Sequence, residues 1–241
     1  MKTIFSKAII FASLISPMAW AGTGALTAGV GKTSFDLIMP KQTFTSADWT
    51  DLSLTYTNRF DAGGFFNVDY RTSLAAEHDT FADDSGELTP ADLDDTRLSV
   101  TLGGENWYVG LLKTSTDIKA PEGRTSGAGA VSYDLIGMTL GFKAASEITD
   151  GHYFQYGAGV LMAEADLKQV YINSGSEYNA NYDATFGYFY GLGFSGPLGT
   201  TGLAYALKYE VQKIDFESYE NIQELEDKRS RISASLTYVF L

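Results

Sequence analysis

The chain contains no cysteine, only five prolines and, beyond its first 21 residues, no long apolar run. The absence of cysteine excludes disulfides, thiolate metal sites and a lipid anchor on cysteine. A membrane-spanning helix needs roughly 18 consecutive apolar residues, and residues 22–241 contain no such run. The scarcity of proline is typical of a chain with many uninterrupted strands.

Residues 1–21 contain the three parts of a cleavable export signal. Lys2 and Lys7 carry the positive charge, an apolar run follows from Ala8 to Ile15, and Ala19-Trp20-Ala21 supplies small residues at a cleavage site. We therefore expect the chain to be exported across the inner membrane.

The remaining residues 22–241 are predicted to form one domain, because no linker divides them. Removing residues 1–21 takes away two lysines and no acid, so the formal net charge falls from -13 to -15. This negative charge excludes nucleic acid as an expected partner. The mean hydropathy of -0.08 is compatible with an exported soluble protein. It is equally compatible with a membrane barrel, in which every second residue faces the lumen.

The segment 231–240 alternates strictly between two kinds of side chain. One face carries Ile232, Ala234, Leu236, Tyr238 and Phe240, and the other carries Arg231, Ser233, Ser235 and Thr237. This pattern resembles the closing strand of bacterial outer-membrane β-barrels, which ends in an aromatic signal for the barrel-insertion machinery. Here the aromatic is penultimate, because Leu241 follows it. The resemblance implies a location in the bacterial outer membrane.

Period-two runs separated by turn residues continue along the whole chain and predict an all-β fold. Candidate strands lie near 24–36, 49–60, 64–76, 95–103, 106–116, 127–136, 138–148, 152–162, 166–173, 181–195, 203–216 and 228–240. With both termini in the periplasm the strand number must be even. The sequence thus predicts a transmembrane antiparallel up-and-down β-barrel of about 12 strands. Ten strands are the alternative, if 152–162 and 166–173 belong to one folded-over loop.

The predicted connections alternate in length. Short turns are expected at 61–63, 103–105, 136–137 and 162–164, and longer loops near 37–48, 77–94, 117–126, 174–180 and 217–227. Short turns belong in the periplasm and long loops outside. Two connections fit poorly: Asp150-Gly151 is short for an outer loop, and 195–202 is long for a periplasmic turn.

Charged side chains share one face of the predicted strands, opposite the apolar side chains. A register slip would move each midplane Arg or Lys into lipid at a cost of roughly 2 to 4 kcal/mol. The predicted pore-lining residues are Arg59, Asp69, Arg71, Arg97, Lys143, Asp183, Lys208, Glu210 and Arg231, with Asp51 and Asp134 on the same face. About twelve strands can leave a narrow wet channel. Alternatively, these charges pair across the lumen and plug it.

Aromatic residues cluster at strand ends near the predicted periplasmic turns and at the C-terminus. Phe60, Phe65, Trp107, Tyr238 and Phe240 are therefore expected to anchor the barrel at the membrane interface.

Two predicted outer loops concentrate acidic residues without a lysine or arginine. The first holds Glu77, Asp79, Asp83, Asp84, Glu87, Asp92, Asp94 and Asp95, and the second holds Glu217, Glu220, Glu224, Glu226 and Asp227. Such clusters can recruit divalent cations at a lipopolysaccharide surface. Neither has the Asp-x-Asp-x-Asp-Gly spacing of a calcium loop, so simple solvation is the alternative.

Both histidines, His78 and His152, are predicted near the outer rim. The triplet Asp150-Gly151-His152 has the Asp-x-His spacing of the omptin proteases, and the Asp83-Asp84 pair lies in another outer loop, so an acid-assisted attack by water can be drawn. The chain is shorter than that family and the paired acids are adjacent rather than alternating. We therefore expect no enzyme, no catalytic residue, no metal and no cofactor.

The sequence favours a porin-like channel for passive diffusion of small hydrophilic solutes or ions. A plugged structural or surface-interaction barrel with acidic loops is the alternative, and an outer-membrane hydrolase comes third. The expected partners are outer-membrane lipid, lipopolysaccharide, the barrel-insertion machinery and divalent cations.

Overall fold

The computed structural model describes residues 22–39, 42–61, 63–74, 80–82, 88–90, 92–120, 128–172, 174–199, 202–217 and 223–240. The predicted export signal in residues 1–21 lies outside these residues, as does Leu241. In the described part of the chain no helix is long and apolar enough to span a membrane.

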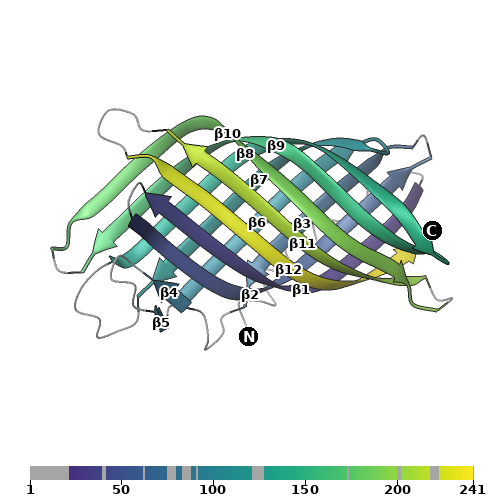
Figure 1. Cartoon of the computed structure of the whole chain (residues 1–241), viewed down its shortest axis with the longest axis horizontal. Helices are drawn as coiled ribbons and strands as arrows, with labels where there is room; N and C mark the ends of the chain where they lie inside the picture. The colour runs from purple at the N-terminus through teal and green to yellow at the C-terminus, as the bar shows by residue number, and fades with distance from the viewer. Residues whose placement is uncertain are drawn as a thin grey trace.

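Ten antiparallel strands form a closed barrel (Figure 1). They are β1 (Gly22–Met39), β2 (Gln42–Phe60), β3 (Phe65–Ser73), β6 (Asp92–Gly103), β7 (Trp107–Lys119), β8 (Ala128–Thr149), β9 (His152–Tyr171), β10 (Glu177–Pro197), β11 (Leu203–Phe216) and β12 (Leu225–Phe240). Neighbouring strands pair in chain order, and β1 pairs with both β2 and β12, which closes the wall. The short strands β4 (Thr80–Ala82) and β5 (Leu88–Pro90) form a hairpin on β2.

The two ends of the barrel differ. One end, which we name the short-turn end, holds Gly22, Phe240 and the connections Asp61–Gly64, 104–106, Asp150–Gly151 and 198–202. The other, the long-loop end, holds the remaining connections and the β4–β5 hairpin. The predicted short turns near 61–63 and 103–105 are confirmed, whereas those at 136–137 and 162–164 are wrong, because these residues lie inside β8 and β9. Asp150–Gly151, predicted as an outer connection, belongs to the short-turn end.

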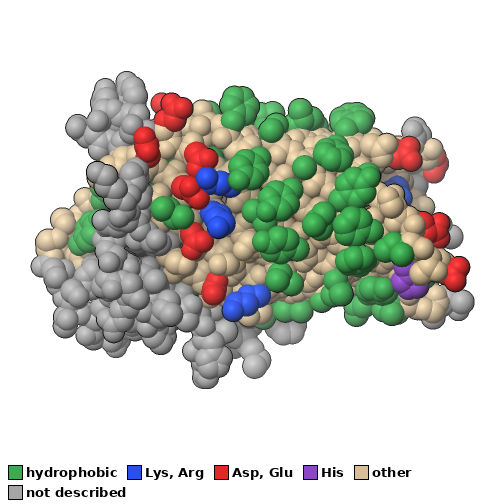
Figure 2. Space-filling model, in the orientation of Figure 1, with side chains coloured by type: hydrophobic (Ala, Val, Ile, Leu, Met, Phe, Trp, Pro, Cys, Tyr) green, Lys and Arg blue, Asp and Glu red, His purple; other side chains and the backbone are tan. Residues whose placement is uncertain are grey.

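An apolar belt surrounds the half of the barrel next to the short-turn end (Figure 2). Exposed side chains of this belt include Leu26, Val30, Leu102, Val109, Leu111, Ile136, Met138, Leu140, Phe142, Val160, Met162, Phe186, Leu192, Leu207, Ile232 and Leu236. Their parity is the one that the alternation predicts for lipid contact, because successive strand residues face opposite sides of the wall.

In the long-loop half the polarity of the two faces is reversed: the outward side chains are polar and the inward ones are apolar. On β1 the outward residues change from Leu26 and Val30 to Lys32, which is exposed, while Phe35 and Leu37 are fully buried inside. Charged pairs also appear outside: Lys213 contacts Glu226 at 2.9 Å and Asp215 at 3.1 Å, where the hydrogen bond to Glu226 raises the pKa of the lysine. This half therefore has the polar exterior and apolar interior of a water-soluble barrel.

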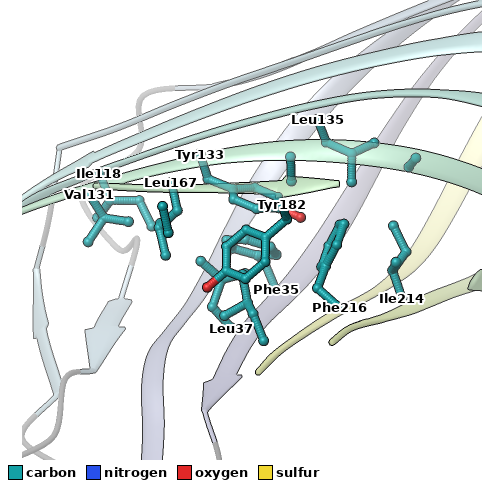
Figure 3. Packing of buried hydrophobic residues seen from close by; sticks show 14 of the residues in the cluster. Phe35, Leu37, Ile118, Val131, Tyr133, Leu135, Leu167, Tyr182, Ile214 and Phe216 are labelled. Atoms are coloured by element: carbon teal, nitrogen blue, oxygen red, sulfur yellow. The ribbon is translucent and has the colours of Figure 1, made fainter. Parts of the chain in front are cut away.

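A hydrophobic core fills the interior of the long-loop half (Figure 3). Its side chains come from strands that are distant in sequence and point toward one another across the lumen. They include Phe35, Leu37, Trp49, Ile118, Val131, Tyr133, Leu135, Leu167, Tyr182, Ile214, Phe216 and Leu225. We name this cluster the core plug.

The reversal of polarity explains why the barrel has ten strands, the stated alternative, and not about twelve. The folded-over loop expected at 152–162 and 166–173 is wrong, because these residues form the single strand β9. On β8 the buried Tyr133 and Leu135 are odd-numbered, whereas the exposed Ile136 and Met138 are even-numbered. The sequence pattern therefore changes phase as it would at a turn, yet the backbone continues as one strand. The same change near Met162 on β9 makes the predicted turn at 162–164 part of a strand.

Candidate functional site: the barrel interior

A polar cavity of about 1080 Å³ occupies the interior on the short-turn side of the core plug. Its lining includes Gly63 and Gly64 of one short turn and Gly104, Glu105 and Asn106 of another, so it extends to this end of the barrel. We name it the vestibule. Inward residues of β2, β3, β6, β11 and β12 supply most of its polar wall.

Ion pairs cross the middle of the interior. Arg231 of β12 contacts Asp51 of β2 at 2.6 Å between Nη2 and Oδ1, over the inner face of the intervening strand β1. Its Nη1 lies 3.5 Å from Glu210 Oε2. The Glu210 carboxylate is also 3.0 Å from Arg71 Nη1, and Arg71 Nε is 3.0 Å from Asp69 Oδ1. These contacts form one network in which both arginines are shared between carboxylates of different strands.

A second polar layer lies between this network and the core plug. Arg229 donates to Asp95 Oδ1 at 3.1 Å and to Thr116 Oγ1 at 3.0 Å, and its guanidinium lies 4.2 Å from the centroid of the Phe35 ring. Tyr133 donates from its hydroxyl to Asp227 at 2.8 Å. Arg229, Asp95 and Asp227 are all buried. This second layer therefore packs between the ion-pair network on one side and the core plug on the other.

Eight of the nine predicted pore-lining residues line the vestibule, namely Arg59, Asp69, Arg71, Arg97, Lys143, Lys208, Glu210 and Arg231. Asp183 does not, and its predicted inward position is wrong. The register of β10 shifts between Tyr182 and Thr185, so a bulge reverses the parity. Tyr182 is therefore buried inside and Asp183 is exposed. Asp134 is also exposed, because it shares the parity of outward Ile136.

Cationic side chains slightly outnumber acidic ones along the vestibule. Seven cationic side chains line the vestibule, against Asp51, Asp69, Asp95, Glu105 and Glu210 as acids. The sequence interpretation missed Arg229, Asp95 and Asp227 as interior residues. Arg229 shares the parity of Arg231 on β12 and could have been found from that spacing, whereas the two acids were assigned to solvated loops.

The predicted interface aromatics divide into two groups. Trp107, Tyr238 and Phe240 are exposed on the outer surface near the short-turn end. Phe65 is buried and lines the vestibule, where Lys143 Nζ lies 3.3 Å from its ring centroid, so its predicted interfacial position is wrong. Phe60 also borders the vestibule. The reason is that Phe65 begins β3 with the inward parity of Asn67 and Asp69.

The acidic segments are only partly described, and many of their residues, His78, Asp83 and Asp84 included, lie outside the described part. Three of these acids have partners on the strands: Asp95 pairs with Arg229, Asp227 accepts from Tyr133, and Glu226 pairs with Lys213. Within the described ranges, no group of three or more His, Cys, Asp or Glu residues could hold a metal ion.

His152 lies at the short-turn end, where β9 begins, and not at the long-loop end, where the sequence predicts it. Its Nδ1 is 3.2 Å from the Thr149 carbonyl oxygen, and its ring lies near Tyr205. Ala82, which directly precedes Asp83, pairs with Ser46 toward the opposite end of the barrel. Asp83 and Asp84, the paired acids of the hydrolase hypothesis, lie outside the described residues.

The sequence matches no protein-family model and no curated protein. Among solved structures, the outer membrane protease OmpT from Escherichia coli is similar with a TM-score of 0.60 and 10% identity, covering 92% of this chain and 98% of OmpT. Neisserial surface protein A gives a TM-score of 0.41 and 11% identity, over 89% of this chain and 97% of that protein. OprG from Pseudomonas aeruginosa gives 0.37 and 13%, over 92% and 97%. The chain thus has the fold of bacterial outer-membrane β-barrels.

Proposed function

We propose that the protein is an outer-membrane barrel closed to solute, which anchors a folded, water-exposed half and its acidic loops at the cell surface. The observation that carries this proposal is the core plug. Phe35, Tyr133 and Ile214 come from three different strands and are fully buried in the same cluster. A hydrated path through the lumen would have to separate side chains that are packed as in a protein interior.

The layers below the core plug support the same proposal. Arg229 and Arg231 are each held by carboxylates of other strands, and both are almost completely buried. Opening a path along the wall would break these contacts and leave buried charges without partners, which is strongly unfavourable. The geometry therefore favours the plugged barrel over the porin-like channel.

The distribution of surface polarity supports a direction for the barrel. The short-turn end holds the start of β1 and the end of β12. It would face the periplasm, as short turns do in barrels of this class. The long-loop half has a polar exterior and would extend from the membrane into water beside lipopolysaccharide. Its acidic segments would then be available to divalent cations or to a surface partner.

Protease activity, which the name of OmpT states, receives no support from the geometry. The Asp150–His152 triplet lies at the short-turn end, which in this proposal faces the periplasm. A likeness at 10% identity concerns the fold and does not transfer a function.

Conductance in a planar bilayer tests the proposal. Purified wild-type protein is expected to give no conductance steps. The double variant Phe35→Ala/Trp49→Ala removes two rings of the core plug that contact each other with centroids 6.1 Å apart, and it is expected to conduct. Leu236→Ala, on the lipid-facing surface, is the matched control and should remain silent. Wild-type steps as large as those of the double variant would overturn the proposal.

A further inference from the structure

Four of the seven cations in the vestibule have no acidic partner among the described residues: Arg59, Arg97, Lys143 and Lys208. The other three are the arginines of the ion-pair layers described above. Arg97 and Lys208 experience the charge of Glu210, but none of the four forms an ion pair with a described carboxylate. Arg59, Lys143 and Lys208 lie on the short-turn side of the network.

The unpaired cations act on one another. Lys143 experiences the positive charges of both Arg59 and Lys208, an unfavourable interaction that no described carboxylate offsets. Its Nζ lies over the Phe65 ring, whose face attracts a cation only weakly compared with a carboxylate. A chain with 30 acidic residues nevertheless places these like charges together around one cavity.

Glycines make the room that these side chains need. Gly157 pairs with Lys143 and Gly193 pairs with Lys208 on the neighbouring strands. A Cβ on Gly193 would lie 2.8 Å from the Leu207 carbonyl oxygen and 3.1 Å from Lys208 Cγ, and a Cβ on Gly157 would lie 2.8 Å from the Phe142 carbonyl oxygen. On one side of each lysine, the neighbouring strand therefore carries no side chain at the paired position, which leaves room in the cavity there.

We propose that the vestibule binds a soluble multivalent anion bearing phosphate or carboxylate groups, held by Arg59, Lys143 and Lys208 with Arg97 deeper in the cavity. Four positive charges around one wet cavity complement a ligand with several negative charges, since guanidinium and ammonium groups both donate to such oxygens. The cavity reaches the turns of the short-turn end, so the anion would enter from the aqueous side rather than from lipid. This site does not depend on whether the core plug blocks conduction.

Titration calorimetry with inorganic pyrophosphate, in a detergent with an uncharged headgroup, tests the site on the full-length folded protein. Saturable binding with one anion per chain is expected. Lys143→Gln/Lys208→Gln should weaken it at least tenfold, whereas Lys143→Arg/Lys208→Arg should retain it. Citrate in place of pyrophosphate distinguishes a requirement for phosphate from one for carboxylate, and both outcomes support the site.

The matched control is Lys113→Gln/Lys119→Gln, which removes two exposed cations from the outer surface of β7. This control should bind pyrophosphate as the wild type does. Absence of saturable binding to wild type, or an equal loss in the control, would overturn the proposal.

Unfolding in urea provides an independent readout. Without pyrophosphate, the Lys143→Gln/Lys208→Gln variant should unfold at a urea concentration close to that of the wild type, because the repulsion lost around Lys143 offsets the attraction lost between Lys208 and Glu210. Pyrophosphate should raise the midpoint of the wild type and not of the variant, since a ligand stabilises the folded state that binds it. An unchanged wild-type midpoint at saturating pyrophosphate would contradict the proposal.

Discussion

At the scale of single residues, the interior arginines differ in what surrounds them. Arg231 and Arg229 are buried and fixed by carboxylates, whereas Arg59 and Lys208 point into the open vestibule without such partners. Both kinds of residue share the inward parity, so the sequence can place them on the same face. It cannot show which strands bring a carboxylate opposite each cation, because that depends on closure of the barrel between β1 and β12.

Removal of the Asp51 carboxylate should destabilise the barrel. Asp51→Asn leaves the buried Arg231 guanidinium without its partner at 2.6 Å, and we expect a loss of about 3 kcal/mol in the free energy of unfolding. Urea titration in detergent, followed by tryptophan fluorescence, measures it. The control Asp48→Asn breaks an exposed pair with Lys32 at 3.9 Å and should cost less than about 1 kcal/mol. Similar losses in both variants would contradict this prediction.

At the scale of elements, each long strand contains two alternating patterns of opposite phase. A strand that is apolar outside in one half and apolar inside in the other has, at the change, two adjacent apolar residues such as Leu135 and Ile136 on β8. The sequence predicted most strands and most inward charges correctly because period two holds within each half. The prediction from sequence divided β8 and β9 each into two strands, because it took the change of phase for a turn. In the structure each strand continues, and the change of phase marks the point where the lipid-facing half of the barrel ends.

The tight turn between β8 and β9 should depend on its glycine. Asp150 has φ 36° and Gly151 has φ 79°, the combination that a two-residue hairpin turn requires. Gly151→Ala meets no atom closer than 3.7 Å, so the cost is conformational, about 1 kcal/mol in the free energy of unfolding. Chemical denaturation measures it, with exposed Ser146→Ala on β8 as a control that should stay within about 0.5 kcal/mol. A neutral Gly151→Ala would show that the turn rearranges.

At the scale of the whole molecule, the barrel has a lipid-facing half and a water-facing half, with charge and polarity arranged to match. The apolar belt occupies the short-turn half, and exposed charges such as Lys32 and Asp134 surround the long-loop half. The resemblance of the last strand to outer-membrane barrels predicted the fold class. It could not predict the core plug, because inward apolar residues from nine strands become neighbours only in the closed ring.

Single cysteines can establish the direction of the barrel, because the chain has none of its own. Ser174→Cys lies in the exposed turn between β9 and β10 at the long-loop end, and Glu105→Cys lies in a turn at the short-turn end. A membrane-impermeant maleimide should label the first in intact cells and the second only after the outer membrane is permeabilised. The reverse pattern would invert the orientation.

The composition of the core plug also constrains the order in which the barrel assembles. Phe35 belongs to the first strand, Tyr133 to the middle of the chain and Leu225 to the last strand. Contacts of such high sequence separation require large loops to close before they form, which makes them late events in folding. The lumen of a nascent barrel therefore stays wet until the first and last strands join, and its drying and the completion of the seam are a single step.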